Sequence, residues 1–118
     1  MEILFIEYPK CTTCQKAKKW LEENKIKFND RHIIEQNPTI EELNKWIDLS
    51  GVEIKKWFNT TGMKYTELNL KDKLDNMSNN EKIELLASDG MLVKRPVVIT
   101  SNWACAGFKV NEWEKNLK

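Results

Sequence analysis

The chain has 118 residues, of which 41% are hydrophobic and 31% are charged, a composition that suits one globular domain with a core of its own. Nineteen basic residues are almost balanced by eighteen acidic ones, so the net charge of +1 gives no support to direct nucleic-acid binding. No apolar run approaches the ~20 residues of a membrane span and no signal-peptide pattern is present, so we expect a cytoplasmic monomer without membrane contact.

The first third of the chain predicts a strand, a helix and a second strand. The apolar run over residues 2–6 is typical of a strand, and residues 18–24 are typical of a helix. Between them, at the strand-to-helix turn, lies the Cys-x-x-Cys pair of Cys11 and Cys14. Residues 26–34 alternate apolar and polar side chains, which predicts the second strand. Because the three elements form a βαβ unit, we expect the two strands to be parallel.

Helices are predicted for the middle of the chain, between about residues 39 and 90. Thr39 and Glu42 fit a capping box at the start of one helix, and Ser78 and Glu81 fit a second one. Between these two helices the apolar pattern stays helical but is interrupted. The residues expected to face inward from the two capped helices are Ile40, Leu43, Trp46, Ile47, Ile83, Leu86 and Ala87.

Strand character returns near the end of the chain. Residues 96–100 and 103–108 are separated by a two-residue turn, which predicts an antiparallel hairpin, and Asn111 is expected to cap a last helix. The order is therefore βαβ, helical insert, ββα, which predicts an α/β fold with a four-stranded mixed sheet and helices on both faces. A Cys-x-x-Cys pair after the first strand is typical of a thioredoxin-like domain, here over residues 1–118.

The position of the two cysteines predicts a redox pair. A thiol reacts as its thiolate, which the free N–H groups of a helix start and nearby ammonium groups favour. The ammonium groups in question are those of Lys10, Lys16, Lys18 and Lys19. We predict that Cys11 is the exposed nucleophile with a low pKa, and that the more buried Cys14 attacks a mixed disulfide on Cys11. The alternative is a pair of unreactive cysteines near a helix start.

One other residue could contribute to the site, and two could build a different one. Pro96 is expected to be cis and to lie against Cys11, or else merely to begin an edge strand. Cys105 and His32 could complete a zinc site with the Cys-x-x-Cys pair, but they fall on separate predicted strands and the spacing is not that of two knuckles. We therefore expect no metal, and interpret Cys105 as a core residue and His32 as a strand-face residue.

Several segments resemble one family of known proteins. The segments that carry the resemblance are Tyr8 to Ala17, Trp20-Leu21-Glu22, the break Asn59-Thr60-Thr61-Gly62, Leu92 to Val97 and Gly107-Phe108. Together they resemble the glutaredoxin-like arsenate reductases and their relatives, the Spx/MgsR group of redox regulators. The resemblance covers essentially the whole chain and implies a thioredoxin-like core with a helical insert.

In the reductases that this chain resembles, one cysteine attacks arsenate, three arginines hold the oxyanion, and glutathione and glutaredoxin complete the cycle. Cys11 matches the cysteine and Arg95 matches one arginine, whereas Thr61 and Phe108 stand where the other two would be. Each missing guanidinium removes charge-assisted hydrogen bonds of ~1.5 to 3 kcal/mol, so efficient arsenate reduction is not expected. Lys64 could bring charge, as could Lys109, but without the forked geometry.

We therefore expect a thiol/disulfide oxidoreductase with catalytic Cys11, Cys14 and Arg95, and with substrate contacts from Lys10, Lys64 and Pro96. No cofactor is expected to be bound, and the expected reductant is glutathione, glutaredoxin or a thioredoxin-type protein. The resemblance leaves an alternative, a redox-sensing regulator that binds the C-terminal domain of the RNA polymerase α subunit. Such regulators carry a basic, glutamine-rich tail that this sequence, which ends at Lys118, does not show.

Overall fold

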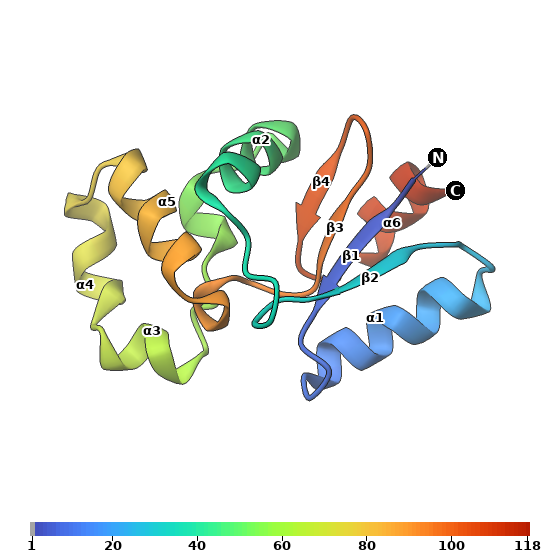
Figure 1. The fold of residues 1–118 in the computed structure, drawn as a ribbon, viewed down its shortest axis with the longest axis horizontal. Helices are drawn as coiled ribbons and strands as arrows, with labels where there is room; N and C mark the ends of the chain where they lie inside the picture. Colours follow the sequence, from blue (N-terminus) through green and yellow to red (C-terminus); the bar gives the residue numbers. More distant parts are fainter. Residues whose placement is uncertain (1) are drawn as a thin grey trace.

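The structure is a computed structural model that describes residues 2–118. Four strands form one mixed sheet in the order β2-β1-β3-β4 (Figure 1). The central strand β1 (Leu4–Glu7) pairs in parallel with β2 (Asn29–His32) and antiparallel with β3 (Val97–Ile99), which pairs antiparallel with β4 (Ala104–Ala106). The predicted parallel βαβ unit, antiparallel hairpin and four-stranded mixed sheet are therefore confirmed.

The second strand is shorter than the sequence predicted. Only residues 29–32 of the expected 26–34 join the sheet. At the front end, the N–H of Ile26 donates to the carbonyl of Leu21, which ties this residue to the turn after the preceding helix. At the far end, His32 Nδ1 accepts the N–H groups two and three residues later, which turns the chain away from the sheet.

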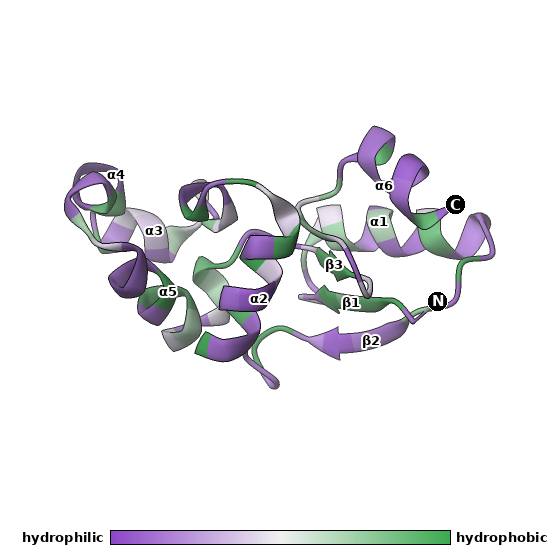
Figure 2. Ribbon diagram, turned by 90° about the horizontal axis from the view of Figure 1, so that it is seen from above, coloured by the Kyte–Doolittle hydropathy of each residue, from purple (hydrophilic) through white to green (hydrophobic). Residues whose placement is uncertain are grey.

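Helices cover both faces of the sheet, as the sequence predicted (Figures 1 and 2). On one face, α1 (Thr12–Glu23) and α6 (Val110–Leu117) pack on a cluster that contains Phe5. On the other face, α2 (Ile40–Ser50) and the central helices pack on a cluster that contains Ile6. Successive side chains of a strand point to opposite faces, so β1 contributes to both cores.

The middle of the chain is helical but interrupted, as predicted. Its elements are η1 (Ile54–Trp57), α3 (Met63–Glu67), α4 (Leu70–Lys73), η2 (Leu74–Asn76), α5 (Asn79–Ser88) and η3 (Gly90–Leu92). Both predicted capping boxes, at the starts of α2 and α5, are present. Ile40 was wrongly predicted to face inward: it is the first residue of α2, lies outside the core cluster and is 47% exposed. Within residues 2–118, no helix is long and apolar enough to cross a membrane.

The start of the last helix also differs from the prediction. Asn111 was expected to cap it, but α6 already begins at Val110. The N–H of Trp113 donates to the carbonyl of Lys109 at 2.9 Å, which closes the first helical turn ahead of Asn111. Lys109 is therefore the N-cap, and its side chain makes no capping hydrogen bond.

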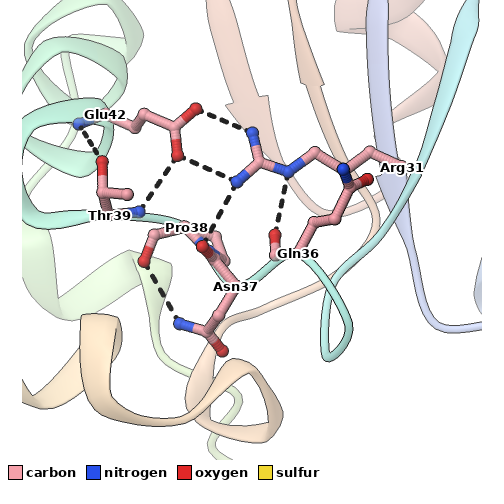
Figure 3. Close-up of polar contacts among 6 residues, drawn as sticks. All are labelled: Arg31, Gln36, Asn37, Pro38, Thr39 and Glu42. Carbon is pink, nitrogen blue, oxygen red and sulfur yellow. Dashed lines mark hydrogen bonds and ion pairs between the residues drawn. The ribbon is translucent and has the colours of Figure 1, made fainter.

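One ion pair fastens β2 to the start of α2 (Figure 3). Arg31 Nη1 and Nη2 donate to the two carboxylate oxygens of Glu42 at 2.7 and 2.9 Å. The same guanidinium donates to the carbonyls of Gln36 and Asn37, and it lies over the Trp46 ring at 5.6 Å. Four hydrogen bonds from one guanidinium thus close the loop between β2 and α2.

Candidate functional site

The candidate site begins where β1 turns into α1. Cys11 is the N-cap residue of α1, with extended backbone angles. Its N–H donates to the carbonyl of Tyr8, and the Gln15 side chain donates to the carbonyl of Pro9, so the turn is held at two points. The N–H of Cys14 points at Cys11 Sγ from 3.5 Å. A sulfur at this position receives the free N–H groups of the first helical turn, where negative charge is favoured.

The surroundings of Cys11 lower its pKa below the ordinary value. Partial burial works against the thiolate, but it is outweighed by hydrogen bonds from the N–H and thiol of Cys14, the charge of Arg95 and the N–H of Thr13. The side chain is half-buried, so the sulfur keeps access to the surface. Cys11 therefore combines a lowered pKa with access to the surface, the two features that favour reactivity of a cysteine.

Cys14 lies in the opposite environment. It is fully buried, and burial raises its pKa to about 12, with a further rise from the neighbouring Cys11 sulfur. The N–H of Tyr8 offsets only part of this effect. Cys14 is therefore a neutral thiol at physiological pH, and it donates to the Cys11 sulfur. Both cysteines are free thiols.

Arg95 supplies the positive charge of the site. Its Nη1 donates to the carbonyls of Met91 and Val93 at 3.2 and 3.3 Å, and its guanidinium carbon lies 5.5 Å from the centre of the Tyr8 ring. Its Nε is buried and has no hydrogen-bond partner within residues 2–118. The following Pro96 is buried, and the bond between them is cis, as expected from the sequence.

An open cleft of about 420 Å³ lies beside the Cys11 sulfur. It is bounded by the first turn of α1, the segment before α3, the start of α3 and η3, which lie on the lower side of Figure 1. Its lining residues are Cys11, Thr13, Asn59, Thr61, Gly62, Met63, Lys64, Met91 and Arg95. We name this the Cys11 cleft.

The Cys11 cleft collects some of the predicted substrate residues and leaves others out. Cys11, Arg95 and Lys64 line it, and Lys64 Nζ lies 4.0 Å from a carboxylate oxygen of Asp89. Lys10 is exposed and does not line the cleft, and neither does the buried Pro96. Sequence reasoning missed the contributions of Thr13, Asn59, Met63 and Met91. The break at residues 59–62 was a usable signal, but no sequence pattern pointed to the two methionines.

The two positions without arginine lie in different surroundings. Thr61 lines the Cys11 cleft, so a longer side chain there would reach its opening. Phe108 instead packs in an aromatic cluster, with ring centres 6.2 Å from Trp20 and 4.8 Å from Trp113. Phe108 therefore contributes to packing between α1 and α6, in place of a charge.

Lys18 lies after Cys14 in α1, but its charge is engaged elsewhere. Lys18 Nζ lies 3.3 Å from Glu7 and 2.8 Å from Asp30, so its charge is answered by two carboxylates. Burial raises the pKa of Glu7 to about 7, and Asp30 adds to this rise. The positive charge that favours the Cys11 thiolate is that of Arg95, far away in the sequence.

The other two candidates for a zinc site, Cys105 and His32, lie on β4 and β2, at opposite edges of the sheet. Cys105 is buried in β4, and burial raises its pKa. The His32 ring packs edge-on against Tyr8. In the part of the chain that the structure describes, no three histidine, cysteine, aspartate or glutamate side chains are placed to share a metal ion.

Comparison with known proteins finds relatives over nearly the whole chain. Residues 6–116 match the model of the family described as the ArsC family. YusI, an uncharacterized protein of Bacillus subtilis (strain 168), is 54% identical, and the match covers 98% of this chain and 98% of YusI. The regulatory protein MgsR of the same organism is 33% identical over 94% of this chain and 86% of MgsR.

Solved structures agree with this result. An ArsC family related protein from Bacteroides fragilis is 56% identical with a TM-score of 0.97, covering 100% of this chain and 98% of its own. A possible arsenate reductase from Streptococcus mutans UA159 is 38% identical with a TM-score of 0.86, covering 95% and 97%. The thioredoxin-like fold expected from the sequence is thus confirmed. The relatives include both a regulator and a reductase-like protein.

Proposed function

The chain belongs to the ArsC family, and we propose that it is a thiol/disulfide oxidoreductase with Cys11 as nucleophile and Cys14 as resolving thiol. The observation that carries this proposal is the contrast between two adjoining thiols. The pKa of half-buried Cys11 is lowered, whereas burial raises that of Cys14 to about 12. One sulfur is thus ready to attack while the other is held in reserve.

The reaction exchanges one disulfide for another. The Cys11 thiolate attacks a sulfur of the substrate disulfide, a bond forms between them, and the second substrate sulfur leaves as a thiolate that takes up a proton. Cys14 then gives its proton to water and its sulfur attacks Cys11 Sγ. The Cys11–Cys14 disulfide forms, and the first substrate sulfur leaves and is protonated. Two electrons pass from the cysteine pair to the substrate.

The environment of Cys14 changes at the right step of this sequence. The Cys11 charge and its hydrogen bond both raise the pKa of Cys14 in the free protein. When Cys11 becomes part of a mixed disulfide its charge is gone, and that contribution disappears. Cys14 therefore ionises more easily once there is a disulfide for it to attack.

We propose that a small thiol or a protein of the glutaredoxin or thioredoxin type returns the two electrons by reducing the Cys11–Cys14 disulfide. We place this cycle in a reducing compartment such as the cytoplasm, because three cysteines cannot all pair within one chain. Arsenate is not the proposed substrate, since Arg95 is the one guanidinium that lines the described cleft.

Alkylation across pH tests this proposal. Iodoacetamide should modify Cys11 with a titration below the ordinary thiol value of ~8.5, and buried Cys105 serves as a slow internal control. Mild peroxide should then link Cys11 to Cys14 in the wild type, as seen by peptide mass spectrometry, but not in Cys14→Ser. Titration of Cys11 at or above ~8.5 would count against the assignment.

A second candidate function is redox-sensing regulation, favoured by the 33% identity to MgsR. In this case the same cysteine pair changes the affinity of the chain for the C-terminal domain of the RNA polymerase α subunit. A pull-down with that domain, using the reduced and the oxidised chain, separates the two functions. If neither state binds, this candidate is removed.

A further inference from the structure

The Cys11 cleft has the size and lining of a site for a polypeptide. Building on the proposed oxidoreductase function, we infer that its substrate is a disulfide-bonded cysteine within a polypeptide segment, and that Met63 and Met91 hold the residues beside that cysteine. The electron balance is that of the exchange described above. The new element is the class of molecule that carries the disulfide.

The volume of the cleft is the first argument. Clefts of about 300 to 1,000 Å³ accommodate organic ligands of many atoms, and the Cys11 cleft, at about 420 Å³, lies in this range. A tetrahedral oxyanion, one central atom with four oxygens, would leave most of this space empty. The cleft is therefore shaped for a larger molecule that approaches the Cys11 sulfur.

The charges of the cleft are the second argument. Of its two cations, Lys64 lies near Asp89, whereas Arg95 bonds only to two main-chain carbonyls through Nη1 and keeps its charge unmatched within residues 2–118. The Thr61 hydroxyl and the Asn59 side chain are neutral and bond to each other at 3.2 Å. A small ligand with several carboxylates therefore finds one unmatched cation, Arg95, in the described cleft. The neutral amides of a polypeptide match such donors and acceptors better.

The exposure of Met63 is the third argument. It is 79% exposed, more than any other large apolar side chain in residues 2–118, and it lines the Cys11 cleft at the start of α3. The N–H of Gly62 donates to the carbonyl of Asn59, and a Cβ on Gly62 would lie 2.7 Å from Asn59 Nδ2. This tight turn fixes where Met63 emerges. An exposed apolar side chain that lines the same cleft as Cys11 can contact an apolar group of a bound molecule.

Met91 lies in the same cleft and is half-buried. Its carbonyl accepts from Arg95, so its main chain is anchored beside the charge that favours the Cys11 thiolate. Two flexible thioether side chains adapt to different apolar neighbours without demanding one sequence. The cleft is therefore expected to accept cysteines flanked by various apolar residues.

A comparison of two disulfides tests this inference. One is the disulfide-linked dimer of a blocked, uncharged pentapeptide with leucine on each side of its cysteine, and the other is glutathione disulfide. Their rate constants with the reduced full chain are each divided by the rate constant with dithiothreitol, which removes differences in intrinsic reactivity. We expect the normalised value to be about tenfold higher for the peptide, as apolar anchors contribute on this scale.

Substitutions assign the preference to the methionine. Met63→Gln keeps the side-chain length and should lower the ratio of peptide to glutathione rates about fivefold. Leu68→Gln is the matched control, because Leu68 is an exposed apolar residue that follows α3 and lies outside the cleft. It should leave the ratio unchanged. Far-UV circular dichroism checks that both variants are folded.

The outcomes separate the two proposals. If both disulfides oxidise the Cys11–Cys14 pair at equal normalised rates, or if Met63→Gln behaves like Leu68→Gln, the polypeptide inference is wrong and the oxidoreductase function stands. If neither disulfide oxidises the pair, both are wrong. If Met63→Gln instead weakens binding of a folded polymerase domain and leaves the peptide rate unchanged, the methionine belongs to a protein interface and the inference is overturned.

Discussion

Arg31 and Arg95 each place a guanidinium over an aromatic ring, at 5.6 Å from Trp46 and 5.5 Å from Tyr8. Their other contacts differ. Arg31 forms two hydrogen bonds with the carboxylate of Glu42, whereas Arg95 bonds to main-chain carbonyls through one nitrogen and leaves its Nε unpartnered in residues 2–118. One charge is matched by an opposite charge, and the other is not.

The difference explains what each arginine can do. A carboxylate next to a guanidinium cancels most of its electrostatic effect on more distant groups. Arg31 therefore acts locally, by closing the loop between β2 and α2 (Figure 3). Arg95 has no carboxylate within bonding distance in the described chain, and its charge helps lower the pKa of Cys11. The following predictions test this division between a structural and a functional arginine.

Removing the charge of Glu42 should give the largest effect. Glu42→Gln keeps a side-chain oxygen for the capping box but leaves Arg31 without its carboxylate, which should lower the free energy of unfolding by about 2 kcal/mol. Glu41→Gln, on an exposed neighbour in the same turn, is the control. Urea unfolding measures both. The rate of Cys11 alkylation should not change. A slower rate would show that Arg31 also affects Cys11, which would contradict the division between a structural and a functional arginine.

The same ion pair predicts a dependence on pH. The hydrogen bonds from Arg31 are the main reason why the pKa of Glu42 lies below its ordinary value of 4.5. Glu42 therefore stabilises the folded state above that value, and this contribution is lost as the pH falls through the lower folded pKa. Wild type and Glu42→Gln should accordingly converge in stability in acid.

Sequence patterns predicted the fold well because local signals agreed with the final packing. The capping boxes at Thr39 and Ser78 start helices where they were expected, and the two-residue turn joins β3 to β4 as an antiparallel hairpin. Errors occurred where a local pattern competed with a neighbouring contact. Asn111 is a good capping residue, yet the helix begins before it because Trp113 reaches back to Lys109.

The candidate site was harder to predict. The Cys-x-x-Cys motif is local, so the placement of Cys11 at the start of α1 could be inferred. The source of the positive charge near Cys11 could not be inferred from the sequence. Lys18 is close to Cys11 in sequence but pairs with Glu7 and Asp30, whereas Arg95, which lowers the pKa of Cys11, is about 80 residues away along the chain. The methionines of the cleft likewise come from separate elements that only the tertiary structure brings together.

A further prediction measures how much of the lowering of the Cys11 pKa is independent of Arg95. The Cys14 thiol donates a hydrogen bond that lowers the pKa of Cys11. Cys14→Ala removes this donor and should slow Cys11 alkylation at pH 7 about tenfold, the value of one hydrogen bond to a charged group. Cys14→Ser keeps a hydroxyl donor and should react faster than the alanine variant. Equal rates would show that the helix start and Arg95 suffice.

The next prediction concerns a guanidinium added to the Cys11 cleft. Thr61 lines this cleft, so Thr61→Arg should place a second arginine near Arg95 without a carboxylate partner. Arsenate binding, measured by its protection of Cys11 from alkylation, should strengthen about fivefold, as expected for one partly exposed charge-assisted contact. Thr60→Arg is the control, because Thr60 is exposed and does not line the cleft. Equal protection in both variants would mean that the added charge acts non-specifically.

The smallest expected effect tests the comparison most directly. Arg95→Gln removes the charge but keeps a donor for the carbonyls of Met91 and Val93, so the fold should be preserved. Since burial and the Cys14 hydrogen bonds have larger effects than Arg95 on the pKa of Cys11, alkylation at pH 7 should slow only about threefold. Lys10→Gln, next to Cys11 in sequence but outside the cleft, should change the rate less. The Arg95 effect should also shrink with added salt less than the Lys10 effect, because its charge is partly buried. If Lys10→Gln slowed alkylation more than Arg95→Gln, the charge that activates Cys11 would be that of Lys10, and the proposed difference between Arg31 and Arg95 would be wrong.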